Sequence, residues 1–154
     1  MMPFLLVFSL MANLISPTSE IWFLPIAGGE IVRPFRAPET PYGPGHRGID
    51  ISAAMNNPVL SPTDGTISFI GKVGYRNLVT VETPQGFMTM EPVCSEMLVG
   101  EPIQAGSEIG SVCLPDPEYV WHCGECFHLG LRTESGYLSP ELYLGGLTPS
   151  RLLP

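Results

Sequence analysis

The sequence has little positive charge. Lys72 is its only lysine, and the 7 basic residues are outnumbered by 15 acidic ones, which gives a formal net charge of −8. Proteins that hold a nucleic-acid backbone use clusters of lysine and arginine, which displace counterions from the phosphates. The charge balance therefore argues against nucleic acid as a partner.

Sustained helical patterns are also missing. No segment keeps a helical hydrophobic period over three turns, and glycine and proline number 17 each among 154 residues. So many helix-breaking residues exclude a helix bundle or a coiled coil. Apolar residues still make up 44% of the chain and charged residues only 14%, which provides a core and argues against disorder. Length and composition therefore predict one domain of short strands joined by turns.

Alternation of apolar and polar residues marks the expected strands. A short helix could begin at Ser139–Pro140, where proline suits the first helical position. We therefore predict an all-β fold, a compact antiparallel β-sandwich or roll with few or no helices. The segments that carry the strand pattern are 65–70, 78–83, 87–91, 108–112 and 126–132.

The N-terminal segment 1–15 carries no charge and is mostly apolar. It is shorter than the roughly 20 residues that a membrane-spanning helix needs, and it suits the apolar part of a secretory signal peptide. A buried first strand is the alternative, because no basic residue precedes the apolar run. We predict a signal peptide or N-terminal anchor over 1–19, an extracytoplasmic location, a folded domain over 20–145 and a loose C-terminal tail over 146–154.

The four cysteines are Cys94, Cys113, Cys123 and Cys126. An even number in an exported chain suggests disulfides, and four cysteines allow three pairings. Cys123 and Cys126 are close enough in sequence to bridge locally, which would leave Cys94 with Cys113. In a reducing compartment the same residues would instead be free thiols or metal ligands.

Two of the three histidines lie in segments suited to a metal site. His46 and Asp50 are four residues apart, and Gly45 and Gly48 make a helix there unfavourable. In an extended segment an even separation puts both side chains on one side. Imidazole and carboxylate groups are ordinary zinc ligands. The alternative is a His–Asp hydrogen bond that fixes a loop.

The second segment is the expected strand 126–132. Its odd-numbered residues are apolar and are expected to face the core, so His128 and the other even-numbered residues share the opposite face. That face is either the floor of a site or a solvated sheet surface.

These segments, in this order and at this spacing, resemble the lysostaphin-type, or LytM-type, zinc metallopeptidases, which cleave peptide bonds in peptidoglycan. The likeness runs from about Trp22 to Leu144. It rests on the His-x-x-x-Asp motif in 45–50 and on three later segments, 58–67, 99–110 and 128–140.

The resemblance implies a β structure of the duplicated hybrid motif type. It also implies a zinc ion held by His46, Asp50 and His128, with the fourth position open to water or to the scissile carbonyl. Zinc polarises such a carbonyl and lowers the pKa of its bound water toward about 7. Peptidoglycan peptides are the implied substrate.

Two positions depart from the family's pattern. Cys126 stands where the family has the first histidine of a His-x-His motif, and Pro92 stands where it has a further histidine. The resemblance gives these histidines the roles of general base and oxyanion stabiliser, and general acid–base catalysis contributes about 10²–10⁴-fold. The candidate substitutes are Cys126, Glu91 and His122. The segment 121–128 resembles the ending of a divergent exported branch, which supports a local Cys123–Cys126 disulfide.

The sequence therefore predicts an exported zinc-dependent endopeptidase that hydrolyses peptidoglycan cross-links. The alternative is a catalytically impaired zinc-binding domain that binds cell-wall peptides or regulates a partner hydrolase. A lipoyl- or biotinyl-type carrier is disfavoured, because its lysine would lie at the turn of 99–110, whereas Lys72 lies in a different hairpin.

Overall fold

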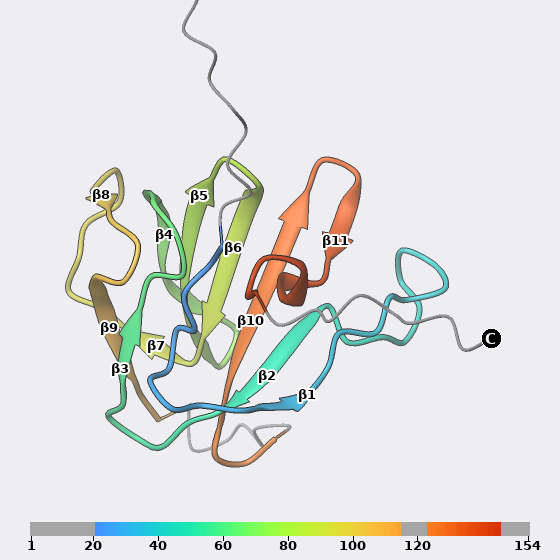
Figure 1. The fold of residues 1–154 in the computed structure, drawn as a ribbon, viewed down its shortest axis with the longest axis horizontal. Helices are drawn as coiled ribbons and strands as arrows, with labels where there is room; N and C mark the ends of the chain where they lie inside the picture. The colour runs from blue at the N-terminus through green and yellow to red at the C-terminus, as the bar shows by residue number, and fades with distance from the viewer. Residues whose placement is uncertain (1–20, 115–122, 146–154) are drawn as a thin grey trace, which may run out of the picture.

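The structure of the protein is a computed structural model that describes residues 21–114 and 123–145. Within these residues the chain consists of strands, turns and one short 3-10 helix, η1 (Pro140–Leu142), which follows the capping residue Ser139. The strands form two antiparallel sheets (Figure 1). The predicted all-β antiparallel fold is confirmed.

The larger sheet has eight strands, and its neighbouring strands are antiparallel. Because β2 lies on one side of β10 and β6 on the other, β10 joins parts of the chain that are far apart in sequence (Figure 1). The strands, in spatial order, are β1 (Ile31–Arg33), β2 (Gly48–Ser52), β10 (Cys126–Thr133), β6 (Gly86–Glu91), β5 (Arg76–Thr83), β4 (Gly65–Val73) and β8 (Pro102–Ile103), with β11 (Gly136–Leu138) paired to β10.

The smaller sheet has three strands, in the order β3 (Pro58–Leu60), β9 (Glu108–Val112) and β7 (Val93–Cys94). A disulfide joins Cys94 of β7 to Cys113, directly after β9. The second disulfide joins Cys123 to Cys126. Of the three pairings that four cysteines allow, the structure therefore has the one in which Cys123 bridges locally to Cys126 and Cys94 bridges to Cys113.

One apolar core lies between the sheets and contains side chains from both. The alternation expected for β10 is present, since Phe127, Leu129 and Leu131 are completely buried. Burial of an apolar side chain of this size contributes roughly 1.5–3 kcal/mol. A slip of β10 by one residue would expose all three, so the core fixes the register of this strand and the face on which His128 lies.

The two ends of the described domain are held together by Trp22 and Tyr143. Their rings stack with centroids 4.9 Å apart, and the Trp22 backbone N–H donates to the Tyr143 carbonyl at 2.7 Å. Across residues 21–114 and 123–145, no helix has the length and apolar character needed to cross a membrane. The predictions of a signal peptide or anchor over 1–19 and of a loose tail over 146–154 fall outside the described residues.

Candidate metal centre

Strand register brings together residues that are distant in sequence. His128 of β10 is the direct partner of Asp50 on β2 and also of Glu91 on β6. Directly opposed residues of antiparallel strands project to the same face of the sheet. Asp50, His128 and Glu91 therefore form a row across three strands, on the face opposite the apolar core.

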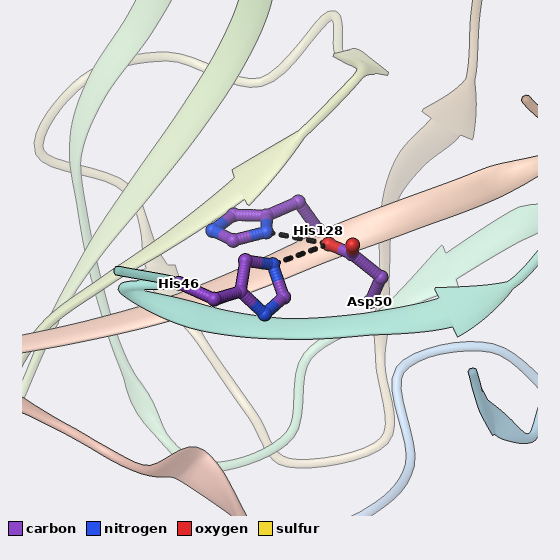
Figure 2. A group of neighbouring side chains, drawn as sticks. All are labelled: His46, Asp50 and His128. Carbon is purple, nitrogen blue, oxygen red and sulfur yellow. Dashed lines mark hydrogen bonds and ion pairs between the residues drawn. The ribbon is translucent and has the colours of Figure 1, made fainter. Parts of the chain in front are cut away.

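The side chain of His46 completes a cluster around the Asp50 carboxylate (Figure 2). Nδ1 of His128 lies 2.7 Å from Oδ1 of Asp50, and Nε2 of His46 lies 3.0 Å from the same oxygen. The three ligand atoms all lie within 4.8 Å of one another. Of the residues predicted as zinc ligands, the structure therefore brings all three, His46, Asp50 and His128, to one place.

The hydrogen bond to Pro34 sets the tautomer of His46. Nδ1 of His46 lies 2.8 Å from the Pro34 carbonyl oxygen, and a carbonyl only accepts, so Nδ1 carries the proton. In the neutral ring, Nε2 then turns a lone pair toward the Asp50 oxygen. Nε2 of His46 and Oδ1 of Asp50 would then both be acceptors 3.0 Å apart, and they repel each other unless a proton or a cation lies between them.

The Asp50 carboxylate is buried, and a buried negative charge needs a positive partner. Asp50 is fully buried and His46 is 7% exposed. An ionised carboxylate in such a place is stable only when it is paired or coordinates a metal. Two imidazoles and a carboxylate with one solvent-facing side are the ligand set of an open zinc site, whose Zn–N and Zn–O distances are about 2.0–2.2 Å. The cluster therefore fits a zinc ion.

Gly48 provides the space that the His128 ring occupies. A Cβ atom at Gly48 would lie 2.6 Å from Nε2 of His128 and even closer to the Leu129 carbonyl oxygen. At Gly130, the partner of Gly48 on β10, an added Cβ would meet only ordinary contacts of 3.4 Å and more. In the sequence, Gly48 counts as evidence against a helix and as part of the motif segment 45–50, and neither observation predicts its contact with His128. A glycine inside a strand is also a signal of close approach by another group.

Glu91 is the partner of His128 on β6, and only one of its two carboxylate oxygens has a hydrogen-bond partner among the described residues. Its Oε1 accepts a hydrogen bond from Nη1 of Arg76 at 2.8 Å, and the residue is only 5% exposed. Its Oε2 is buried, with no hydrogen-bond partner among the described residues. Glu91 was predicted from the sequence, whereas Arg76 was not, because the two residues are 15 positions apart and meet only across the β5–β6 pairing.

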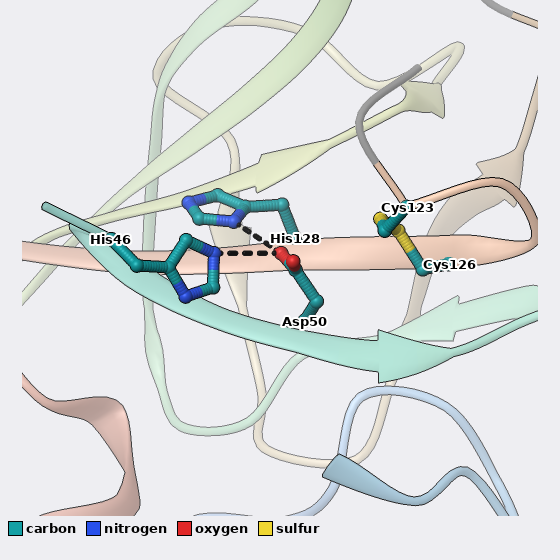
Figure 3. The surroundings of a disulfide bond; sticks show 5 residues. All are labelled: His46, Asp50, Cys123, Cys126 and His128. Carbon is teal, nitrogen blue, oxygen red and sulfur yellow. Dashed lines mark hydrogen bonds and ion pairs between the residues drawn. A yellow bond between two sulfur atoms is a disulfide. The ribbon is translucent and has the colours of Figure 1, made fainter. Parts of the chain in front are cut away.

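Cys126, the second proposed substitute, lies next to the cluster on the same face of β10 (Figure 3). It is 2% exposed, and its sulfur is bonded to that of Cys123. In this oxidised state Cys126 has no thiol to donate or accept a proton. His122, the third proposed substitute, falls outside the described residues.

An open groove of about 1330 Å³ runs along this face of the larger sheet, and His128 and Glu91 both line it. Beyond His128, two guanidinium groups lie near the ring of Tyr137, with Arg47 at 5.6 Å and Arg132 at 5.9 Å from its centroid. The groove therefore offers a path for an extended chain past the metal-ligand cluster and toward positive charge.

An antiparallel β fold with a buried His–Asp–His cluster beside an open groove defines a metallopeptidase-like domain. A model of peptidase family M23 matches residues 44–140, a range that contains His46, Asp50, Glu91 and His128. The chain belongs to this family.

The chain is also similar to a curated mycobacterial protein. The uncharacterized protein Rv2891 of Mycobacterium tuberculosis is 33% identical over 129 residues, which cover 80% of this chain and 51% of the relative. The chain therefore spans about half of that relative's length.

Solved structures with a similar fold include the following two. Helicobacter pylori Csd3 superposes with a TM-score of 0.66 at 22% identity, over 88% of this chain and 37% of that one. A zinc-containing peptidase from Vibrio cholerae superposes with a TM-score of 0.57 at 19% identity, over 71% of this chain and 36% of that one. At these identities the likeness shows the fold alone.

Proposed function

We propose that the protein is a zinc-dependent endopeptidase that hydrolyses peptide bonds of peptidoglycan cross-links outside the cytoplasm. The observation that carries the proposal is the convergence of His46, Asp50 and His128, whose ligand atoms lie within 4.8 Å of one another around a fully buried carboxylate. Membership of peptidase family M23 supports the reaction class. The two disulfides suit an oxidising compartment.

The three ligands would hold zinc through Nε2 of His46, Oδ1 of Asp50 and Nδ1 of His128. The Pro34 carbonyl holds the His46 ring in the tautomer that exposes Nε2, and such oriented ligands bind metals more tightly. When bound, a zinc ion supplies Lewis-acid polarisation of the scissile carbonyl and a water of lowered pKa. His128 and Glu91 both line the groove, so a substrate there approaches the cluster from this side.

Glu91 is the residue that we propose for proton transfer. Its Oε2 has no hydrogen-bond partner among the described residues, whereas the Arg76 guanidinium occupies Oε1. Oε2 would accept the proton of the attacking water and return it to the leaving amine, as a general base and then a general acid. Glu91 would thereby replace the histidines that the family pattern has at positions 92 and 126.

The groove would bind the substrate peptide as an extended chain along β10. Gly130 has no side chain to block a close approach of the peptide backbone between His128 and Arg132. Arg132 is exposed at the far end of this path, where its guanidinium can pair with a substrate carboxylate.

A second candidate function is a zinc-binding domain that binds wall peptides, or regulates a partner hydrolase, without cleaving. The observation that favours it is the disulfide at Cys126, which leaves no acid or base at that position. Pro92, at the other departure, has no titratable group at all.

Purified protein incubated with purified peptidoglycan separates the two functions. The endopeptidase releases new amino groups, stops when a chelator removes the metal, and recovers when zinc is restored. Asp50→Asn removes the charge of the buried ligand and should abolish zinc binding and amino-group release. Glu108→Gln, which removes the charge of an exposed residue on β9, is its matched control and should change neither. Zinc binding and sedimentation with peptidoglycan, but no amino-group release, would establish the second function and reject the first.

A further inference from the structure

The disulfide between Cys123 and Cys126 lies against the proposed zinc ligands. Cys126 precedes His128 by two residues on β10, so both side chains project to the same face. Their partners on β2 are Ser52 and Asp50, respectively. Figure 3 shows the two sulfur atoms on the side of Asp50 away from His46.

Asp50 is shared by two groups of potential ligand atoms. One group is His46, Asp50 and His128; the other is Asp50, Cys123 and Cys126, whose oxygen and sulfur atoms also lie within 4.8 Å of one another. In the oxidised protein the sulfur atoms of the second group are bonded to each other. A disulfide sulfur is a poor ligand, whereas a thiolate is among the best ligands for zinc.

We propose that Cys123 and Cys126, once reduced, become metal ligands together with Asp50, so that the disulfide controls which protein ligands the metal has. This inference rests on the proposed function, because Asp50 belongs to both ligand groups. It adds a thiol–disulfide control that the zinc peptidase reaction itself does not require.

The reduction consumes a dithiol, which supplies two electrons and two protons. A thiolate of the reductant attacks the sulfur of Cys123, which is half-buried, whereas Cys126 is 2% exposed. The S–S bond between Cys123 and Cys126 breaks, a new S–S bond forms within the reductant, and both cysteines become thiols. Each sulfur that then binds the metal releases one proton to solvent.

The two redox states differ in the ligands that they offer to the metal. In the oxidised protein the ligands are His46, Asp50 and His128, and a tetrahedral zinc site with three protein ligands keeps one position open, as catalytic sites do. In the reduced protein Asp50 can instead hold the metal together with the two thiolates on its other side (Figure 3). The oxidised protein therefore holds the metal beside the imidazoles, and the reduced protein holds it more tightly beside the thiolates.

The disulfide between Cys94 and Cys113 provides an internal comparison. Cys94 and Cys113 lie at the smaller sheet, and within residues 21–114 and 123–145 they belong to neither group of potential metal ligands. Reduction of the Cys94–Cys113 disulfide should therefore change neither the ligands of the metal nor the zinc affinity.

Cobalt(II) in place of zinc tests the inference, because only a thiolate ligand gives a sulfur-to-cobalt charge-transfer band in the near ultraviolet. The protein is loaded with one equivalent of cobalt, either oxidised or after reduction with dithiothreitol and anaerobic desalting. Zinc affinity is measured in both states by competition with a chromophoric chelator. The variants are Cys123→Ser/Cys126→Ser and Cys94→Ser/Cys113→Ser.

We expect the band only in the reduced protein and in reduced Cys94→Ser/Cys113→Ser. We also expect zinc to bind about tenfold or more tightly after reduction, which corresponds to about 1.4 kcal/mol. If the reduced protein binds one cobalt without showing the band, this inference is wrong and the proposed zinc site stands. The same conclusion follows if the band persists in Cys123→Ser/Cys126→Ser. Oxidised protein that binds no cobalt overturns the proposed function and this inference with it.

Discussion

His128 and Asp50, 78 residues apart in the sequence, lie directly opposite each other on β10 and β2, with Nδ1 of His128 2.7 Å from Oδ1 of Asp50. The relationship depends on the register of two strands that are not neighbours in sequence. That register is held by the complete burial of Phe127, Leu129 and Leu131 on the other face of β10. The geometry of the His46–Asp50–His128 cluster is therefore a product of core packing, and changes that disturb the packing of β10 should weaken metal binding at this cluster.

Substitution Gly48→Ala should weaken metal binding without removing any ligand. The new Cβ would lie 2.6 Å from Nε2 of His128 and even closer to the Leu129 carbonyl oxygen, so both the ring and the backbone of β10 must move. Overpacking of this kind costs about 1–3 kcal/mol of stability. Zinc affinity and thermal unfolding measure the two effects. Gly130→Ala, on the partner residue, is the control and should change both much less. Equal effects of the two variants would show that the His128 ring does not depend on Gly48.

Removal of zinc should lower the stability of the fold. A ligand that binds only the folded state stabilises it by about 2.7 kcal/mol when its free concentration is 100 times its Kd. We expect chelator to lower the Tm of the protein and added zinc to restore it. His46→Ala should bind no stoichiometric zinc, keep its sheet structure by circular dichroism, and show a Tm that zinc does not change. Wholesale unfolding of that variant would instead point to a structural role for His46.

Substitution Glu91→Gln should slow peptide hydrolysis with little change in zinc content. The amide keeps an oxygen for Arg76 but cannot take up a proton, and loss of a general base costs about 10²–10⁴-fold in rate. Amino-group release from peptidoglycan measures the rate, and metal analysis measures the zinc. Glu82→Gln, an exposed carboxylate that lines the same groove, is the control. An unchanged rate in Glu91→Gln would remove this residue from the reaction.

An imidazole at position 126 should raise the rate of cleavage. Cys126 lies on the cluster's face of β10, so Cys126→His combined with Cys123→Ser would place a titratable ring where the disulfide now lies. We expect a gain of up to about 10²-fold, within the range of general acid–base catalysis. Cys123→Ser/Cys126→Ser loses the same disulfide without gaining a ring, so it separates the two effects. Equal rates in both variants would mean that the departure at Cys126 does not limit catalysis.

The fold was largely predictable from the sequence because its strands are amphipathic. Alternation in the segment 126–132 is a local pattern with a period of two, and it correctly places the apolar residues of β10 in the core. The spacing of His46 and Asp50 is equally local. It suggested a shared side for the two residues, and the structure brings their side chains within 3.0 Å.

The remaining parts of the site depend on contacts that no local pattern contains. The close approach of Gly48 to His128 follows from the pairing of β2 with β10. The Arg76–Glu91 ion pair arises because β5 and β6 lie side by side. The nearness of the Cys123–Cys126 disulfide to Asp50 needs both strands and the turn before β10. Such information lies in tertiary register, which a single sequence specifies only through the whole core.

The stacking of Trp22 on Tyr143 has a consequence for how this domain can be carried by longer chains. Since the backbone of one residue is hydrogen-bonded to the backbone of the other, the domain starts and finishes at a common point on its surface. Neither residue lines the groove that passes His128. Segments that precede Trp22 or follow Tyr143 would therefore leave the domain at a point outside the groove, and the matched relative is about twice as long as the region that this chain covers.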